Sequence, residues 1–305
     1  MSDRLLRLLV GVLIFFVIAW VAARFFTGDG ASASGSFGLA AVAGGSIDSV
    51  VVTSADDTVR LRAGDPWTVN GHEALPETGS MLTRGLEESQ VGQLVSRNPE
   101  NHARMGVTDA AGRRLTVYPE NGEPISIIVG ERAGAFNQSY ARRVGADEVY
   151  VLEGSLSNLA NREEDDWRDR EIFAVERAGV QRVEFTYPGE SFALVRDSAG
   201  WRLEPSGAGA RAGDVSNLLG QLTALRAIGF ADDSAAAALA WDEPAARVGV
   251  IGPDDAELVE LLFQENEDVG YFVRRAGSSV VYTLSSYTGN VILRRETALA
   301  TASDG

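Results

Sequence analysis

The residues of this sequence that could carry chemistry are two histidines, a glycine-rich segment and an acidic cluster. His72 and His102 stand thirty positions apart, without the spacing that metal-binding histidines share. His102 could act as a base, but no positioned serine or GxSxG segment accompanies it. A hydrolase that uses His102 is therefore a hypothesis without a supporting motif, and we predict no catalytic residue and no metal site.

The segment Gly207–Ala212 has the glycine pattern of a dinucleotide-binding loop and stands between an expected strand and an expected helix. The matching place earlier in the chain, Asn70–Glu73, lacks these glycines, and the strands around both segments do not suggest a βαβ crossover. We interpret Gly207–Ala212 as a flexible loop and predict no cofactor.

The acidic cluster is Glu163–Asp166, which runs directly into Trp167–Arg170. It lacks the glycine and the alternating spacing of a calcium loop. The main interpretation is solvated charge beside a tryptophan docked on a sheet, and the alternative is a contact with a partner. Two pairs of neighbouring arginines on expected strands support the alternative. Because neighbouring strand side chains point to opposite faces, one arginine of each pair could face a partner while the other pairs within the sheet. The candidate partner contacts are Trp167, Arg168, Arg170, Trp241, Arg142 and Arg274.

Composition excludes several classes of protein. The chain has 305 residues, of which 45% are hydrophobic and 23% charged, as in a folded globular protein. It has no cysteine and no lysine, which excludes disulfides, thiolate sites, a Walker A loop and a Schiff base. Acidic residues outnumber basic ones 43 to 27, giving a net charge of −16, so nucleic acid is not an expected partner.

An apolar stretch near the start predicts a membrane anchor. Residues 8–23 carry no charge, and the stretch from Leu5 to Phe26 covers the roughly 30 Å of bilayer hydrocarbon. A cleaved signal peptide, with Ala31–Ala33 as its cleavage site, is the alternative. Because Arg4 and Arg7 precede the stretch, we expect a cytoplasmic N-terminus and a body outside the bacterial inner membrane, in the periplasm or beyond.

The remainder of the chain repeats itself. Trp67 and Trp201 are 134 positions apart, and the segments around Arg142–Leu152 and Arg274–Leu284 correspond at a shift of 132. A shift held this closely indicates a tandem duplication. The predicted divisions are an anchor at residues 1–26, a flexible linker at 27–46, repeat domains at 47–176 and 177–296, and a disordered tail at 297–305.

Each repeat is expected to be an α+β module of mostly antiparallel strands with one packed amphipathic helix. In the second repeat, Asp214 is the expected N-cap of a helix with an apolar stripe at Val215, Leu218, Leu219, Leu222, Leu225 and Ile228. In the first, the stripe is Leu82, Leu86, Val91, Leu94 and Val95, and Asn98-Pro99 is expected to end the helix.

Together these features resemble the family known as domain of unknown function 4340. The resemblance rests on the anchor, the tryptophan hairpin at Val59–Val69, the Met105–Ala110 turn, the Arg142–Tyr150 strand and the Trp167–Arg170 segment. The second repeat departs from the pattern, since its turn at Ala240–Ala245 lacks the glycine and it has no clear Trp-Arg-Asp-Arg. The resemblance implies an exported accessory protein with no enzymatic role, similar to proteins encoded beside ABC-type permeases and a gliding-motility-type auxiliary subunit.

Two functional hypotheses follow. The first is a non-enzymatic, membrane-anchored envelope protein that binds an ABC permease and its auxiliary subunits. The second is a periplasmic module that binds glycan or another envelope ligand through exposed aromatics such as Trp241 and Tyr271.

Overall fold

A computed structural model describes residues 37–301. They form two compact units, and the boundary in the chain falls between Asp169 and Arg170. The predicted division, between residues 176 and 177, lies slightly later in the chain. The second unit begins earlier than predicted, because β10 (Glu171–Ala174) pairs with β14 (Ala224–Arg226) of that unit. The predicted anchor lies outside the described residues. Between residues 37 and 301, no helix is long and apolar enough to cross a membrane.

The first unit is built on a nine-stranded antiparallel sheet with the order β4-β3-β2-β1-β6-β7-β8-β9-β5. Its strands are β1 (Ile47–Thr53), β2 (Thr58–Arg62), β3 (Thr68–Val69), β4 (His72–Glu73), β5 (Gln90–Ser96), β6 (Arg113–Pro119), β7 (Ile125–Arg132), β8 (Gln138–Arg143) and β9 (Val149–Glu153). Its helices are α3 (Leu39–Ala43), α4 (Thr78–Glu88), α5 (Leu156–Ala160) and α6 (Glu164–Trp167).

The second unit has an eight-stranded antiparallel sheet with the order β13-β12-β11-β16-β17-β18-β19-β15, beside the β10-β14 pair. The strands of the large sheet are β11 (Arg182–Tyr187), β12 (Glu190–Asp197), β13 (Gly200–Glu204), β15 (Gly229–Phe230), β16 (Ala246–Ile251), β17 (Glu257–Asn266), β18 (Gly270–Arg275) and β19 (Tyr282–Leu284). The helices are α7 (Ala212–Leu222), α8 (Asp233–Ala238), α9 (Ser286–Ile292) and α10 (Glu296–Leu299).

The two large sheets share one strand order. The order β3-β2-β1-β6-β7-β8-β9-β5 of the first sheet matches the order β13-β12-β11-β16-β17-β18-β19-β15 of the second, and the first sheet has the additional edge strand β4. One long helix follows the edge strand in each unit, α4 after β4 and α7 after β13. Register agrees as well, since Val50 pairs with Leu61 in the first unit and Val183 with Leu194 in the second. The predicted class, mostly antiparallel sheets with a few helices, is confirmed.

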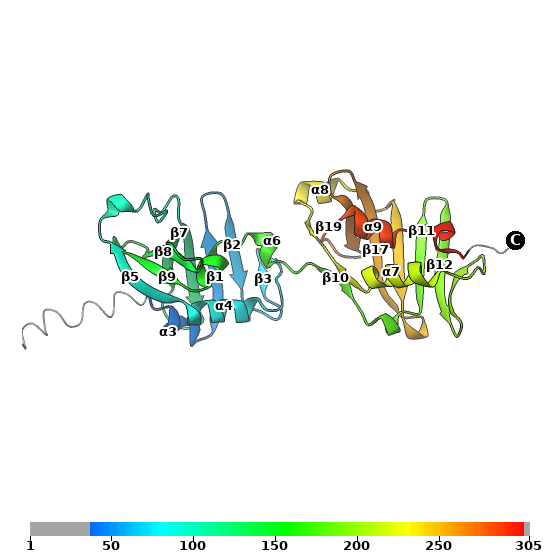
Figure 1. Ribbon diagram of the computed structural model, residues 1–305, viewed down its shortest axis with the longest axis horizontal. Coiled ribbons are helices and arrows are strands. Elements are labelled where there is room, and N and C mark those ends of the chain that lie inside the picture. Colours follow the sequence, from blue (N-terminus) through cyan, green and yellow to red (C-terminus); the bar gives the residue numbers. More distant parts are fainter. Residues whose placement is uncertain (1–36, 302–305) are drawn as a thin grey trace, which may run out of the picture. The chain divides into compact units, whose positions relative to one another are not determined.

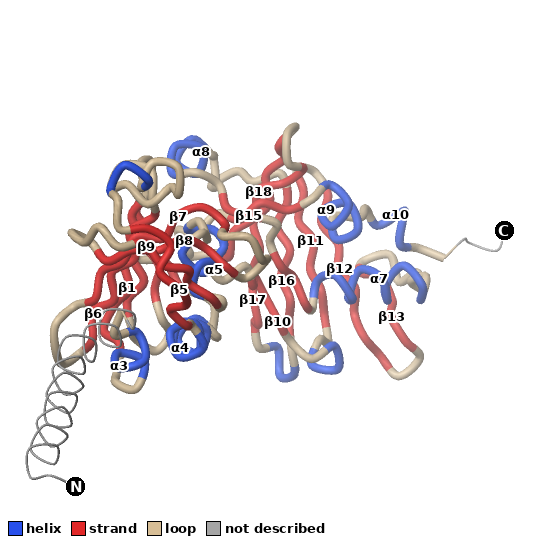
Figure 2. The backbone as a smooth tube through the Cα atoms, turned by 60° about the vertical axis from the view of Figure 1, so that its left-hand side comes forward, coloured by secondary structure: helices blue, strands red, loops and turns tan. Residues whose placement is uncertain are grey.

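Helices cover one face of each sheet and build the main core there. In the second unit α7 runs across the strands, next to α9 (Figure 1), and buries Val215, Leu218 and Leu222 against Phe185 and Leu261. In the first unit α3 and α4 lie side by side (Figure 2) and bury Leu39, Leu82 and Leu86. Each unit also has a small core on the opposite face, around Ile128 in the first and around Trp241 in the second.

The predicted helices are longer than the observed ones. Helix α4 ends at Glu88, and Ser89 turns to an extended conformation, so that Val91, Leu94 and Val95 belong to β5. Strand β5 pairs with β9, which gives the backbone groups of β9 hydrogen-bond partners that a longer helix would leave unpaired. In the second unit the helix ends at Leu222, Leu225 lies in β14, and Ile228 is exposed. The N-cap is Arg211, and Asp214 lies in the first turn.

The described parts of two segments predicted as unstructured are folded, and residues 27–36 and 302–305 of these segments lie outside the described residues. Residues 37–46 of the expected linker contain α3, whose Leu39 and Val42 are buried with Phe37 in the first core. Residues 297–301 of the expected tail include most of α10, and Leu299 is fully buried in the second core. The large apolar side chains of these segments are buried, but they are few among small residues, and for that reason composition alone suggested disorder.

Helix α10 is the counterpart of α6. Leu299 occupies the place of Trp167, at the repeat shift of 132. Each helix is followed by a residue that forms a β-bridge to the segment before the long helix: Arg168 bridges to Ala74, and Ala300 bridges to Ala210. The second unit therefore has this element, although its sequence lacks the Trp-Arg-Asp-Arg pattern.

Candidate functional site

The predicted partner contact Trp167 is an interior residue. Its side chain is 0% exposed, and the guanidinium of Arg162 lies 4.9 Å from its ring. The backbone oxygen of Trp167 accepts a hydrogen bond from the nitrogen of Leu75 (2.8 Å), which ties α6 to the chain before α4. A partner has no access to this ring, so the prediction of a contact surface at Trp167 is wrong.

The neighbouring arginines serve the fold of their own units. Arg168 forms ion pairs with Glu164 (3.7 Å) and Asp165 (3.5 Å), and its side chain is 11% exposed. Arg170 is half-buried, and its backbone oxygen accepts a hydrogen bond from the nitrogen of Ala227 (2.8 Å). The acidic cluster is thus the short helix α6, with a capping box between Glu163 and Asp166.

Arg142 is also buried, with 4% of its surface exposed. Its guanidinium donates to the backbone oxygens of Val107, Arg143 and Ala146 and to Oδ2 of Asp109 (3.0 Å). The hydrogen bond from Arg142 holds the pKa of Asp109 below its ordinary value, and Arg114 contributes in the same direction. Arg142 therefore anchors the loop before β6 to the sheet, and a partner has no access to it.

Arg274 and Trp241, the remaining predicted contacts, lie against each other. The guanidinium of Arg274 is 4.6 Å from the ring of Trp241, which is 8% exposed. Tyr271 is half-buried and donates to Oδ1 of Asn290 (2.7 Å). The prediction that Trp241 offers an open aromatic surface for glycan is therefore wrong. The hydroxyl of Tyr271 is already hydrogen-bonded within its own unit.

The other chemical candidates have structural partners. Nε2 of His102 donates to the backbone oxygen of Asp147 (2.9 Å), because a carbonyl only accepts, and the ring is buried. The segment Gly207–Ala212 forms bridges to β13 and to Ala300, and it leads through α7 into the antiparallel strand β14. Among residues 37–301, no cluster of three potential metal ligands is present.

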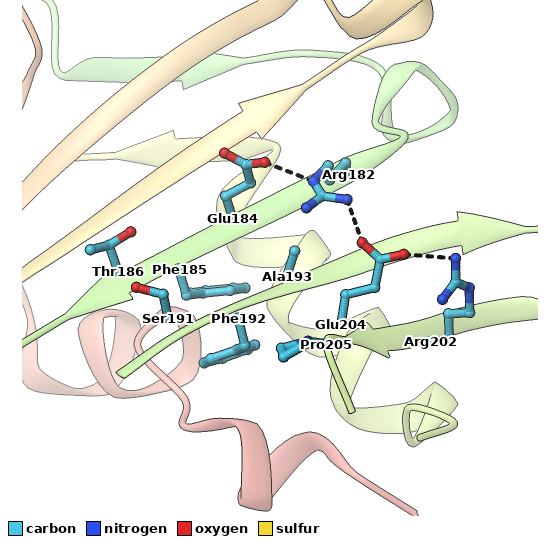
Figure 3. Close-up of a pocket in the computed structure, with 10 residues that line it drawn as sticks. All are labelled: Arg182, Glu184, Phe185, Thr186, Ser191, Phe192, Ala193, Arg202, Glu204 and Pro205. Carbon is cyan, nitrogen blue, oxygen red and sulfur yellow. Dashed lines mark hydrogen bonds and ion pairs between the residues drawn. The ribbon is translucent and has the colours of Figure 1, made fainter. Parts of the chain in front are cut away.

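We use the term open face for one side of strands β1 to β3 in the first unit and of strands β11 to β13 in the second. It is the side that the long helix, α4 or α7, does not cover. In the second unit the open face holds a hollow of about 520 Å³ (Figure 3). Arg182 on β11 reaches across β12 to Glu204 on β13 (2.7 Å) and also pairs with Glu184 (2.7 Å). Glu204 pairs in addition with Arg202 (2.7 Å).

These ion pairs neutralise the open face of the second unit. The hydrogen bond from Arg182 lowers the pKa of Glu204 below its ordinary value, so the carboxylate is ionised at neutral pH. The central strand β12 contributes the uncharged side chains of Ala193 and Val195, which lie between the charged flanks. This face consequently offers a partner little unpaired charge.

On the open face of the first unit the charged side chains lie on the central strand, not on the flanking strands. Its central strand β2 carries Arg60 and Arg62, both exposed, in a hollow of about 750 Å³. By strand register they stand where the second unit has Ala193 and Val195. Their cross-strand neighbours are uncharged: Val51 and Ser49 on β1, and Thr68 on β3.

Neither guanidinium on this face has an ion-pair partner within the described chain. The acidic side chains nearest by register are Asp48, which accepts from Oγ of Ser49 (2.9 Å), and Glu73 on β4, opposite Thr68. Glu164 approaches from α6, but it accepts from Nδ2 of Asn70 (2.7 Å). The alternation Thr58-Val59-Arg60-Leu61-Arg62 does predict arginines on one strand face. Whether carboxylates from other strands neutralise them depends on cross-strand register, which the sequence does not reveal.

A family profile described as Domain of unknown function (DUF4340) matches residues 67–244 and 205–302. The chain belongs to this family. No curated protein and no solved structure matches the chain significantly. In this DUF4340 chain the two matches begin at Trp67, just before β3, and at Pro205, just after β13, which are nearly equivalent places of the two units. The first match crosses from the first unit into the second and ends at Pro244, so the two matches overlap between residues 205 and 244.

Proposed function

We propose that this DUF4340 chain is a non-enzymatic protein of the bacterial envelope, held in the inner membrane by its first 26 residues. Its two units arose by tandem duplication and lie outside the cytoplasm, where they act as an accessory subunit of an ABC-type transport assembly. The apolar stretch at residues 5–26 and the arginines before it support the location.

The open face of the first unit is the observation that carries the interaction role. Arg60 and Arg62 are unpaired in a chain of net charge −16, while the matching face of the second unit is neutralised by its own ion pairs. Guanidinium groups bind carboxylates in a two-pronged geometry that ammonium groups do not match. An acidic segment of a transporter subunit therefore complements this face in charge and in hydrogen bonding.

Reversing the charge of this face is expected to release the partner. Full-length protein purified in mild detergent should bring down a polytopic permease, and Arg60→Glu with Arg62→Glu should lower its recovery at least about tenfold. The reason is that losing one member of a charge pair that becomes buried and hydrogen-bonded in the interface costs about 2–5 kcal/mol. The measurement is quantitative mass spectrometry of the co-purified permease.

A matched control is Arg97→Glu with Arg275→Glu, which makes the same change in net charge at exposed arginines of other strands and loops. This control should retain the permease. The proposal is contradicted if the intact protein is recovered alone in several detergents, or if the reversed face retains as much permease as the control.

A further inference from the structure

The first unit contains a polar hollow that the function above does not use. It lies beside α5, next to the ends of β6, β7 and β8, and has a volume of about 410 Å³. Small-molecule sites in proteins occupy roughly 300–1,000 Å³. Its lining includes Arg113, Glu131, Ser139, Ser157 and Asn158, and Phe136 stands at its margin.

Most polar side chains of this hollow lack partners within the described chain, and the exception is Asn161, whose Nδ2 donates to the backbone oxygen of Ser157 (2.7 Å). Arg113, Glu131 and Asn158 form no side-chain hydrogen bond or ion pair there, and neither do the hydroxyls of Ser139 and Ser157. Both serines are nonetheless buried, at 8% and 4% exposed. Neither serine hydroxyl is fully enclosed without a partner, so both open into the hollow. Polar groups that converge on one hollow in this way offer hydrogen bonds to a polar occupant.

The second unit fills the same place with one of its own side chains. At the repeat shift of 132, Ser139 corresponds to Tyr271, Ser157 to Gly289 and Asn158 to Asn290. The correspondence is structural as well, because Ser139 pairs with Leu152 and Tyr271 with Leu284, at that same shift.

Tyr271 packs tightly in that place. A Cβ atom on Gly289 would come within 2.0 Å of Cδ2 of the Tyr271 ring, so no residue larger than glycine fits beneath it. The hydroxyl of Tyr271 donates to Oδ1 of Asn290 (2.7 Å). The second unit thus shows that this place in the fold holds a six-membered ring whose hydroxyl bonds to the asparagine of the helix.

We propose that the hollow of the first unit binds a saccharide, with a sugar ring where the second unit has the ring of Tyr271. Asn158 then bonds a ring hydroxyl as Asn290 bonds the tyrosine hydroxyl, and Arg113, Glu131 and the two serines serve the others. A purely apolar ring in the hollow would cover these polar side chains without offering them hydrogen bonds, which is costly.

Phe136 supplies the apolar surface that saccharide sites commonly combine with polar groups. It is 77% exposed, and the guanidinium of Arg132 lies 5.2 Å from its ring. Its position at a ligand-sized hollow fits a stacking surface for a second sugar. This site is independent of the open face and of the transport assembly.

The test is isothermal titration of the full-length protein with cellobiose, maltose and N,N′-diacetylchitobiose. At least one disaccharide should bind saturably. The double change Ser139→Tyr with Ser157→Gly copies the arrangement of the second unit and should weaken binding at least about tenfold, because the tyrosine ring occupies the hollow. Phe136→Ala should weaken binding several-fold. Tyr271→Phe, which alters only the second unit, should leave binding unchanged.

The proposal is overturned if none of the three disaccharides binds, or if the filled variant binds as tightly as the intact protein. Should the double variant fail to fold, Asn158→Ala provides the second test, because Asn158 is exposed and tolerates truncation. Unchanged binding in a folded Asn158→Ala variant would likewise overturn the assignment. Neither outcome bears on recovery of the permease, which depends on Arg60 and Arg62.

Discussion

Replacing Trp167 by alanine is expected to lower the free energy of unfolding of the first unit by about 3–5 kcal/mol, the usual range for a buried tryptophan. The ring is fully buried in the first core, and it also receives the guanidinium of Arg162. Its loss leaves a cavity that the rigid sheet beside it cannot close, and it frees α6 from the chain before α4.

Hydrogen exchange read by mass spectrometry measures this effect on the whole protein. Amides of the first unit should exchange faster in Trp167→Ala, while those of the second unit should not change. Tyr287→Ala, at a tyrosine that is 66% exposed, serves as the control and should change neither unit. If Trp167→Ala exchanges like the intact protein, the tryptophan is not a core residue, and its role as a partner contact would have to be reconsidered.

Replacing Arg142 by alanine is expected to cost the first unit about 1–3 kcal/mol. The change leaves the buried oxygen of Val107 without its donor, and it also removes a donor from Ala146 and from Arg143, whose oxygen still accepts from the nitrogen of Ala146 (3.2 Å). Each buried acceptor left unpaired costs about 1–3 kcal/mol. Urea unfolding followed by circular dichroism measures the loss, and the loop before β6 should become open to proteolysis.

Two variants separate the role of Arg142 from a general effect of charge. Arg143→Ala changes the exposed neighbour on the same strand and should leave stability nearly unchanged. Arg142→Lys keeps the charge but loses the planar fork, so it should be destabilised nearly as much as the alanine variant. If Arg142→Ala and Arg143→Ala were equally stable, the anchoring role of Arg142 would be refuted.

The pair between Arg142 and Asp109 also has a definite pH dependence. The pKa of Asp109 is lower in the folded protein than in the unfolded chain, because Arg142 binds its ionised form. The stabilisation is therefore present above the ordinary aspartate pKa and is lost as the pH falls through the lowered value. Asp109 is largely exposed, so solvent screens this contribution and most of the cost of Arg142→Ala comes from the backbone oxygens.

The repeated fold could be predicted because its sequence pattern occurs twice in the chain. The shifts of 132 to 134 between matching strands are visible in the sequence, and alternation on one face marks the strands themselves. The end of α4 was missed because Val91, Leu94 and Val95 continue the helical spacing, while pairing with β9 decides their structure. Helix α10 was missed because Leu299 is one apolar residue among small and polar ones.

The binding sites were not predictable to the same degree. Buried Trp167 and Arg142 resemble exposed contact residues when only the sequence is considered, because burial depends on segments distant in the chain. The open face depends on which residues lie across from Arg60 and Arg62. The polar hollow has one sequence signal, the change from Tyr271 and Gly289 to Ser139 and Ser157 between matching positions of the repeats. This difference indicates a hollow only once the structure shows that Tyr271 fills the corresponding place in the second unit.

The most direct test of the interaction role is site-specific photo-crosslinking in intact cells. A photoreactive residue at Thr68, beside Arg62 on the open face of the first unit, is compared with one at Ser191, on the open face of the second unit. We predict a crosslink from Thr68 to a subunit of an ABC-type transport assembly and none from Ser191. A crosslink to that assembly from Ser191 alone, or no crosslink from Thr68, would contradict the account.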